Sequence, residues 1–133
     1  MIANYHTHTS RCHHAIGNDE EYVLAAIESG LQILGISDHT PYLFPGDYRS
    51  RARMLPEELS DYTGSIRALM NTHGSKIQMH LGVEAEYYPD LWQDTVAMLR
   101  DAGVDYMILG QLWNGNEIDE LQNMIPSDDV DRL

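Results

Sequence analysis

Histidine and carboxylate side chains gather in three separate stretches of this 133-residue sequence. Neutral imidazole and carboxylate oxygen are ligands that suit zinc, iron and manganese. The candidate metal ligands are His6, His8, His14, His39 and Glu84. The sequence therefore predicts a metal centre, provided that the fold brings the three stretches together.

The first stretch holds the pair His6-Thr7-His8 and the adjacent residues His13 and His14. Residues two apart on an extended backbone point to the same side, so His6 and His8 can reach one ion. Adjacent histidines rarely share an ion, so we expect one ligand and one solvated bystander at positions 13 and 14. Cys12 is either a soft ligand or a small buried side chain.

The second and third stretches each follow an apolar run, and they supply Asp38, His39, Glu84 and Glu86. Asp38 can bind metal, accept a hydrogen bond from a ligating imidazole, or cap a turn. Glu84 is nearer to the apolar run than Glu86, and one carboxylate can bridge two cations. Glu86 is a ligand or a solvated residue with equal weight. Asp38 and Glu84 are the candidate catalytic residues.

Three arginines, Arg49, Arg51 and Arg53, fall in a Pro- and Gly-containing stretch over residues 40–55 that we expect to be a loop. They either clamp a substrate phosphate or solvate the loop. His73, before a glycine, is expected at a helix end, and His80 is expected to pack inside a strand.

Short apolar runs alternate with amphipathic stretches, which indicates an α/β fold with a parallel sheet and right-handed crossovers. Strands are expected over residues 2–6, 33–37, 76–83 and 106–109. Helices are expected from residue 18 or 19 to about 30, from 56 to about 70, from 89 to 102, and starting again at 127. The candidate ligands then follow the carboxyl ends of three strands, where parallel α/β folds place their active sites.

The formal charge of −13, from 8 basic and 21 acidic residues, repels phosphate backbones and anionic membranes. We expect neither a nucleic-acid nor a membrane partner. The same charge would repel a small phosphorylated substrate unless bound cations reverse it locally. The single cysteine fits a reducing cytoplasm, and we see neither a signal peptide nor an apolar run near the roughly 20 residues that span a bilayer.

Taken together, these motifs resemble those of the PHP (polymerase and histidinol phosphatase) superfamily, most closely its monofunctional histidinol-phosphatase branch. The matching segments are His6–Thr9 with Arg11–Ala15, then Gly35–His39, then Gly82–Glu86. The resemblance implies a distorted (β/α)7 TIM-like barrel with up to three divalent ions (Zn, Mn or Fe). It implies that His6, His8 and Glu84 hold one metal, that Glu84 bridges to a second, and that His14 and His39 hold a third. The implied reaction, in histidine biosynthesis, hydrolyses L-histidinol phosphate to L-histidinol and phosphate.

Two departures from the family pattern bear on activity. Gly110-Gln111-Leu112 places a leucine where the family presents a histidine, with Asn114 and Glu117 as nearby oxygen donors. The family is also longer, and its later strands carry further ligands. We therefore expect residues 1–133 to be a partial PHP domain without the C-terminal half of the barrel, a fragment or the product of a disrupted gene.

Such a chain would hold fewer metals and would be inactive, weakly active or dependent on a homo-oligomer or partner chain that closes the barrel. A catalytically inactive metal-binding fragment or assembly partner is the second reading. A PHP-type nuclease or proofreading domain is the third, and the acidic charge argues against it.

Overall fold

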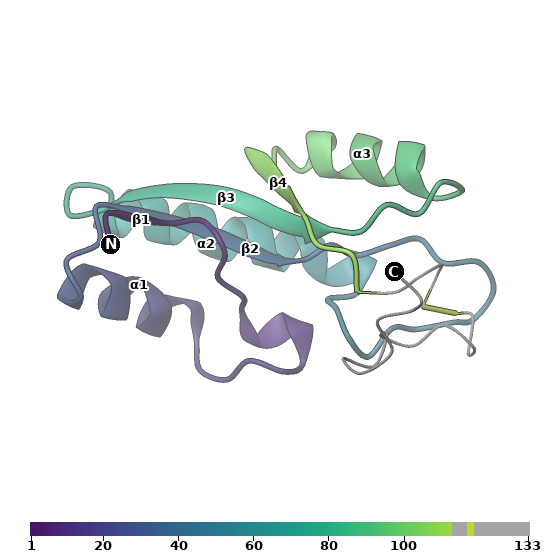
Figure 1. Cartoon of the computed structure of the whole chain (residues 1–133), viewed down its shortest axis with the longest axis horizontal. Helices are drawn as coiled ribbons and strands as arrows, with labels where there is room; N and C mark the ends of the chain where they lie inside the picture. Colours follow the sequence, from purple (N-terminus) through teal and green to yellow (C-terminus); the bar gives the residue numbers. More distant parts are fainter. Residues whose placement is uncertain (113–116, 119–133) are drawn as a thin grey trace, which may run out of the picture.

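The computed structural model describes residues 1–112 and 117–118. Its strands form one parallel sheet in the order β1-β2-β3-β4. The strands are β1 (Ala3–Asn4), β2 (Ile33–His39), β3 (Gln78–Ala85) and β4 (Tyr106–Leu109). Each strand pairs with the next one along the chain (Figure 1), which confirms the prediction of a parallel α/β fold.

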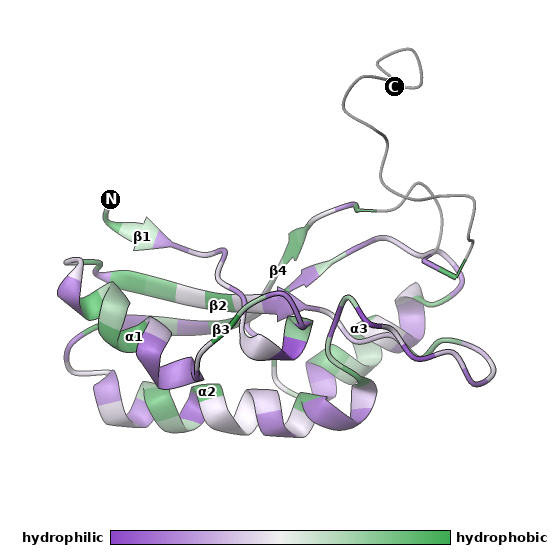
Figure 2. Cartoon of the chain, turned by 90° about the horizontal axis from the view of Figure 1, so that it is seen from below, coloured by the Kyte–Doolittle hydropathy of each residue, from purple (hydrophilic) through white to green (hydrophobic). Residues whose placement is uncertain are grey.

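The three α-helices lie on one side of the sheet, which curves away from them toward β1 and β4 (Figure 2). They are α1 (Asp19–Glu28), α2 (Leu59–His73) and α3 (Trp92–Asp101). Two short 3-10 turns, η1 (Ser10–Cys12) and η2 (Pro56–Glu58), complete the elements of the described residues. This is the geometry of part of a barrel wall, with helices outside.

Most element boundaries agree with the sequence pattern. Helix α1 begins after Asn18, whose side chain accepts a hydrogen bond from the Glu21 backbone while Glu21 bonds back to Asn18. This capping box satisfies two free amides of the first turn. Helix α3 begins at Trp92, three residues later than expected, and the helix predicted from residue 127 lies outside the described residues.

The main core fills the space between the sheet and the helices. Its fully buried members include side chains on the outer face of β2 and β3 and on the inward faces of the helices: Val23, Leu34, Ile36, Tyr62, Ile66, Leu81 and Val83. Because side chains alternate along a strand, the other face of β2 and β3 carries a different set, namely Gly35, Ser37, His39, Gly82 and Glu84. The candidate ligands therefore lie on the concave face, away from the apolar core.

Tyr106 on β4 crosses this concave face and reaches β1. Its hydroxyl donates to the backbone carbonyl of Tyr5 at 2.7 Å, and its ring lies directly over Gly35 and Gly82. A Cβ at either glycine would overlap that ring, so the two glycines make the crossing sterically feasible. Tyr106 thereby links the two outer strands beside the candidate site.

The outward face of β4 is exposed. Met107 and Leu109 are 46% and 71% exposed, and β4 has no strand on its far edge among the described residues. A groove of about 230 Å³ beside Met107 is lined on its other wall by α3 residues that include Val96 and Leu99. Within the described part of the chain, none of the helices is long and apolar enough to cross a bilayer.

Candidate metal centre

Three imidazoles converge on one carboxylate oxygen at the carboxyl ends of β2 and β3. His6 Nε2, His8 Nε2 and His39 Nδ1 each lie 3.2 Å from Glu84 Oε2. The nearest nitrogens of His6 and His8 are 3.1 Å apart. The structure thus brings together residues from three strand ends, as the placement of the motifs predicted.

Strand register explains this convergence. His39 and Glu84 are paired neighbours on β2 and β3, so their side chains share the concave face. Directly after β1, the backbone carbonyls of Tyr5 and Thr7 accept bonds from Ser37, which ties the His6–His8 segment to β2. Gly110, after β4, leaves room for Glu84, because a Cβ at position 110 would overlap the Glu84 carboxylate.

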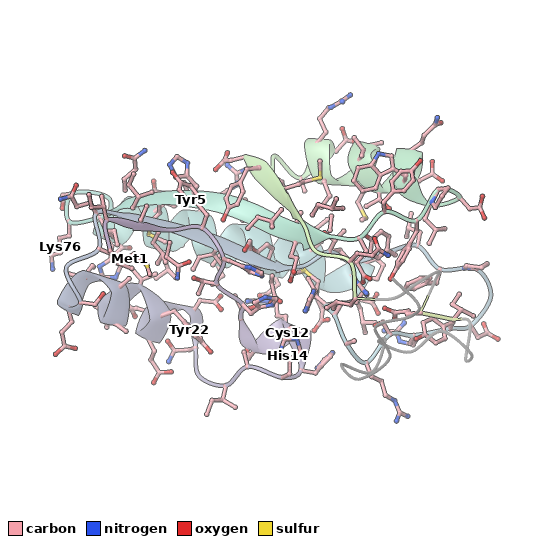
Figure 3. All side chains as sticks on the ribbon, viewed as in Figure 1. Met1, Tyr5, Cys12, His14, Tyr22 and Lys76 are labelled. Atoms are coloured by element: carbon pink, nitrogen blue, oxygen red, sulfur yellow. The ribbon has the colours of Figure 1, made fainter. Side chains whose placement is uncertain are left out.

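His14 lies two residues after the end of η1, close to Cys12 (Figure 3). The centroid of its ring lies 5.4 Å from that of His8 and 5.1 Å from that of His39, and the His8 and His39 centroids are 4.5 Å apart. His13 forms the turn before it with a φ of 65° and is exposed. Of the adjacent pair, His14 is therefore the one that faces the other imidazoles.

The chemistry of these side chains suits a divalent cation. His39 is 4% exposed, and its Nδ1 makes no hydrogen bond within the described residues although it faces Glu84. Burial, together with the positive charges of His8 and Arg53, lowers the pKa of His39 to about 3. The ring is therefore neutral near pH 7, which is the state that ligates metal. A cation bound between His39 Nδ1 and the Glu84 carboxylate would give this buried nitrogen the partner that it lacks.

Asp38 lies behind the cluster, fully buried. Its carboxylate accepts hydrogen bonds from the backbone and hydroxyl of Thr9 and from the His39 backbone, and it lies 3.4 Å from His8 Nδ1. Although burial opposes this, the nearby His8 imidazole and the bonds from Thr9 keep the pKa of Asp38 below its usual value. The same contact with Asp38 raises the pKa of His8. Of the three roles considered for Asp38, this geometry matches the acceptor that orients a ligand.

Cys12 is fully buried, and its thiol donates to the Thr9 carbonyl at 3.0 Å. Burial raises the pKa of the thiol. Two groups of side chains have ligand atoms that all lie within 4.8 Å of one another. One group is His6, His8 and Glu84, and the other is His8, Cys12 and His14. Cys12 is therefore a small buried side chain at the border of the cluster, and its sulfur is also close enough to His8 and His14 to share an ion with them.

Glu86 and Arg53 are placed differently from what the sequence suggested. Glu86 is 1% exposed, so the solvated reading of this residue is wrong. It binds the Arg53 guanidinium at 2.5 Å, and Glu117 binds the same guanidinium at 2.6 Å. Arg53 is also 1% exposed, so it does not solvate its loop. Its cation is held by two carboxylates and leaves little capacity for a phosphate.

Glu117 was one of two oxygen donors considered near Leu112. Its carboxylate contacts Arg53 and the Tyr48 hydroxyl, so it serves the Arg53 network and not the histidine cluster. Asn114, the other donor, lies outside the described residues. The backbone amide of Leu112 donates to Glu86 at 2.8 Å.

The other two arginines of this loop are exposed. Arg49 pairs with Glu57 on the surface beside a pocket of about 280 Å³ lined by Tyr42, Phe44 and Tyr48. Of the three arginines, Arg49 and Arg51 are the ones whose exposure leaves them accessible to an anion.

Comparison with known proteins agrees with this geometry. A family model described as PHP domain matches residues 4–121. Two curated proteins named "Probable histidinol-phosphatase" are similar. The one from Deinococcus radiodurans is 33% identical over 107 residues, covering 80% of this chain and 40% of its own length. The one from Schizosaccharomyces pombe is 27% identical over 112 residues, covering 80% and 36%.

Two crystal structures share the fold. The structure described as "putative histidinol phosphatase hisK" from Listeria monocytogenes superposes with a TM-score of 0.71 at 25% identity, covering 84% of this chain and 45% of that one. A histidinol phosphate phosphatase from Lactococcus lactis, solved with zinc, L-histidinol and phosphate, gives a TM-score of 0.65 at 24% identity, covering 83% and 40%. The chain spans about two fifths of the length of the curated relatives it matches. Since the family model matches most of its length, the chain belongs to the PHP domain family.

Proposed function

We propose that this chain carries the N-terminal metal-binding part of a metal-dependent phosphomonoesterase of the histidinol-phosphatase type. The observation that carries the proposal is the convergence of His6, His8 and His39 on one oxygen of Glu84. The substrate would be L-histidinol phosphate, hydrolysed to L-histidinol and phosphate in histidine biosynthesis. Such an enzyme is expected in the cytoplasm.

The residues divide into two groups of ligands. His6, His8 and Glu84 would hold one ion, and His14 and His39 would hold another, with Glu84 bridging toward a further position. Divalent zinc, manganese or iron, when bound, would acidify water for attack and neutralise the phosphoryl oxygens. Local reversal of charge matters because the chain carries a formal charge of −13 and would otherwise repel a phosphate ester.

Other side chains would orient the ligands and contact the substrate. Asp38 would hold His8 with its Nδ1 proton toward the carboxylate, leaving Nε2 for an ion. It is fully buried, so we assign it to positioning and not to contact with substrate. Glu84, 7% exposed, remains the candidate catalytic carboxylate through the ions it would bridge. Arg49 and Arg51 are the remaining candidates for a phosphate contact.

A second candidate is an inactive metal-binding fragment that needs a partner. Leu112 stands where the family has a histidine, and leucine cannot ligate. We propose that residues 1–133 form a partial PHP domain and that a second copy or a partner chain completes the barrel along β4. The exposed Met107 and Leu109 on that strand support this arrangement.

Metal analysis joined to a phosphatase assay tests the proposal. The purified chain, stripped with chelator, is reconstituted with Mn²⁺, Zn²⁺ or Fe²⁺ and assayed on L-histidinol phosphate and on a generic aryl phosphate. We expect at least one bound ion, and Glu84→Gln should reduce metal affinity by about 100-fold or more. Glu57→Gln, which removes an equal charge from an exposed carboxylate, is the control. Bound metal without turnover would favour the inactive fragment, and wild-type protein that binds no metal would refute both readings.

A further inference from the structure

His14 reaches the cluster from a segment with little regular structure. Between β1 and α1 the backbone bonds of η1 run from Cys12 to Thr9 at 3.3 Å and from His13 to Ser10 at 3.1 Å. The turn then passes through the left-handed conformation at His13. The exposed His14 imidazole lies on this segment. It can hold a fixed position for a metal ion only if other contacts immobilise the segment.

Arg11, in the middle of η1, makes the contacts that can fix it. Its Nη1 donates to both carboxylate oxygens of Asp19, at 3.0 and 2.9 Å. Its Nε and Nη2 donate to Asp61 Oδ2, at 3.0 and 2.6 Å. Asp19 opens α1 and Asp61 lies in the first turn of α2. One guanidinium therefore ties the turn to two helices.

These pairs differ in exposure. The side chains of Arg11 and Asp19 are 15% and 8% exposed, whereas that of Asp61 is 74% exposed. A charged pair in a largely desolvated position is screened less by solvent than a surface pair, so the contact with Asp19 is the stronger of the two. Asp19 also accepts the Ser65 hydroxyl of α2 at 2.5 Å, which fixes the carboxylate that receives Arg11.

Arg11 also touches the polar chain that leads to the ligands. Its Nη1 lies 3.3 Å from the Thr9 hydroxyl, and that hydroxyl donates to Asp38. Asp38 in turn lies 3.4 Å from His8 Nδ1. The guanidinium carbon is 5.7 Å from the ring centroid of Tyr62, which packs under β2 and β3. Arg11 is therefore outside the group of candidate ligands but is connected to His8 through Thr9 and Asp38.

We propose that Arg11 is a positioning residue for the metal centre, fixing the Ser10–His14 turn so that His14 faces His39 and His8. This rests on the proposed function, because it assigns Arg11 a role toward the same ions. Arg11 contacts neither substrate nor metal and acts through His14.

A double-mutant cycle with Co²⁺ as the probe tests this. Affinities are measured by competition with a chromophoric chelator in wild type, Arg11→Gln, His14→Ala and the double variant. Arg11→Gln should weaken the His14-dependent ion by about 10- to 100-fold, the range for supporting partners of metal ligands. In the His14→Ala background Arg11→Gln should have a much smaller effect, because the turn then carries no ligand and only the link through Thr9 and Asp38 to His8 remains.

Two further variants complete the design. Arg11→Lys keeps the charge but not the planar fork, and it should give an intermediate loss. Arg67→Gln removes the same charge from an exposed arginine on α2 that has no role in the proposed site, and it should bind Co²⁺ like wild type. Equal losses in Arg11→Gln and Arg67→Gln, or losses for Arg11→Gln and His14→Ala that add, would overturn the proposal. Wild-type protein that binds no Co²⁺ would instead show that the proposed function fails.

Discussion

At the scale of single residues, burial sets the protonation state of the cluster. His39 is neutral at physiological pH because its surroundings are dry and because His8 and Arg53 contribute positive charge. His8 has the opposite tendency, since Asp38 and then Glu84 favour its protonated form. Without metal, the cluster therefore combines a neutral ring, His39, with a ring, His8, whose protonated form is favoured by its carboxylate neighbours; a cation bound at His8 would compete with that proton.

The lowered pKa of His39 should make the free energy of unfolding depend on pH. As pH falls below 6.5 the unfolded chain gains a proton at this ring that the folded chain does not bind until about pH 3, so acid destabilises the fold. Metal-free wild type should lose up to about 1.4 kcal/mol per pH unit more than His39→Gln over this window. Denaturant unfolding at pH 7, 6 and 5 measures the difference.

The control is His13→Gln, which removes an exposed imidazole outside the cluster. It should not reproduce the shallower pH dependence of His39→Gln. Parallel curves for wild type and His39→Gln would mean that residue 39 does not stay neutral in the folded protein.

Space around Glu84 gives a second prediction at this scale. Gly110→Ala should displace the Glu84 carboxylate, because the added Cβ would overlap it, and should lower metal affinity at least about 10-fold. Gly64→Ala, on α2 with open space around it, should bind metal normally and gain up to about 1 kcal/mol of stability. Equal metal affinity in the two alanine variants would show that Glu84 does not need the room at position 110.

At the scale of elements, the strand ends explain why much of the site could be predicted. Apolar runs before His39 and Glu84 indicate buried strands, and parallel strands place their carboxyl ends along one rim. The structure confirms the four strands and three helices within its described residues. The sequence limited the start of α1 to residue 18 or 19, and the structure shows that Asn18 is the capping residue.

Contacts between side chains far apart in the sequence could not be predicted. Arg53 finds Glu86 and Glu117 33 and 64 residues away, and no local spacing encodes such a meeting. Both roles predicted for Arg53, a clamp for a substrate phosphate and a solvated loop residue, require an accessible side chain. Thr9, Arg11 and Tyr106 were likewise missed as supports, because their roles depend on which helix or strand packs beside them. For Tyr106, the glycines at 35 and 82 were a signal that a large side chain crosses the sheet.

The crossing by Tyr106 predicts a link between the outer strands and the ligands. Tyr106→Phe removes the 2.7 Å bond to the Tyr5 carbonyl, one residue before His6. We expect a loss of about 0.5–1.5 kcal/mol in stability and weaker metal binding at the His6-dependent site. Chemical denaturation and Co²⁺ titration measure the two effects. Unchanged Co²⁺ affinity would mean that β1 is held without this bond.

At the scale of the whole molecule, the described residues form one wall of a barrel with an exposed outer strand face. The chain spans about two fifths of the length of the curated relatives it matches. An exposed edge and apolar face favour association. We therefore predict that the purified chain forms oligomers or binds a partner chain along β4.

Light scattering after size exclusion tests this prediction. Leu109→Lys, at a position 71% exposed on β4, should shift the chain toward monomer. Ile16→Lys, at an 88% exposed position before α1, is the matched control and should leave the oligomeric state unchanged. A thermally stable wild-type monomer would argue against completion by another chain.

The most direct test of the metal centre is a crystal structure of the zinc- or manganese-loaded protein with anomalous scattering at the metal edge. We expect a peak about 2.0–2.2 Å from Glu84 Oε2 and from the facing nitrogens of His6 and His8. A second peak is expected between His14 and His39. Ions bound only elsewhere, with none at Glu84, would show that these residues do not form the metal centre.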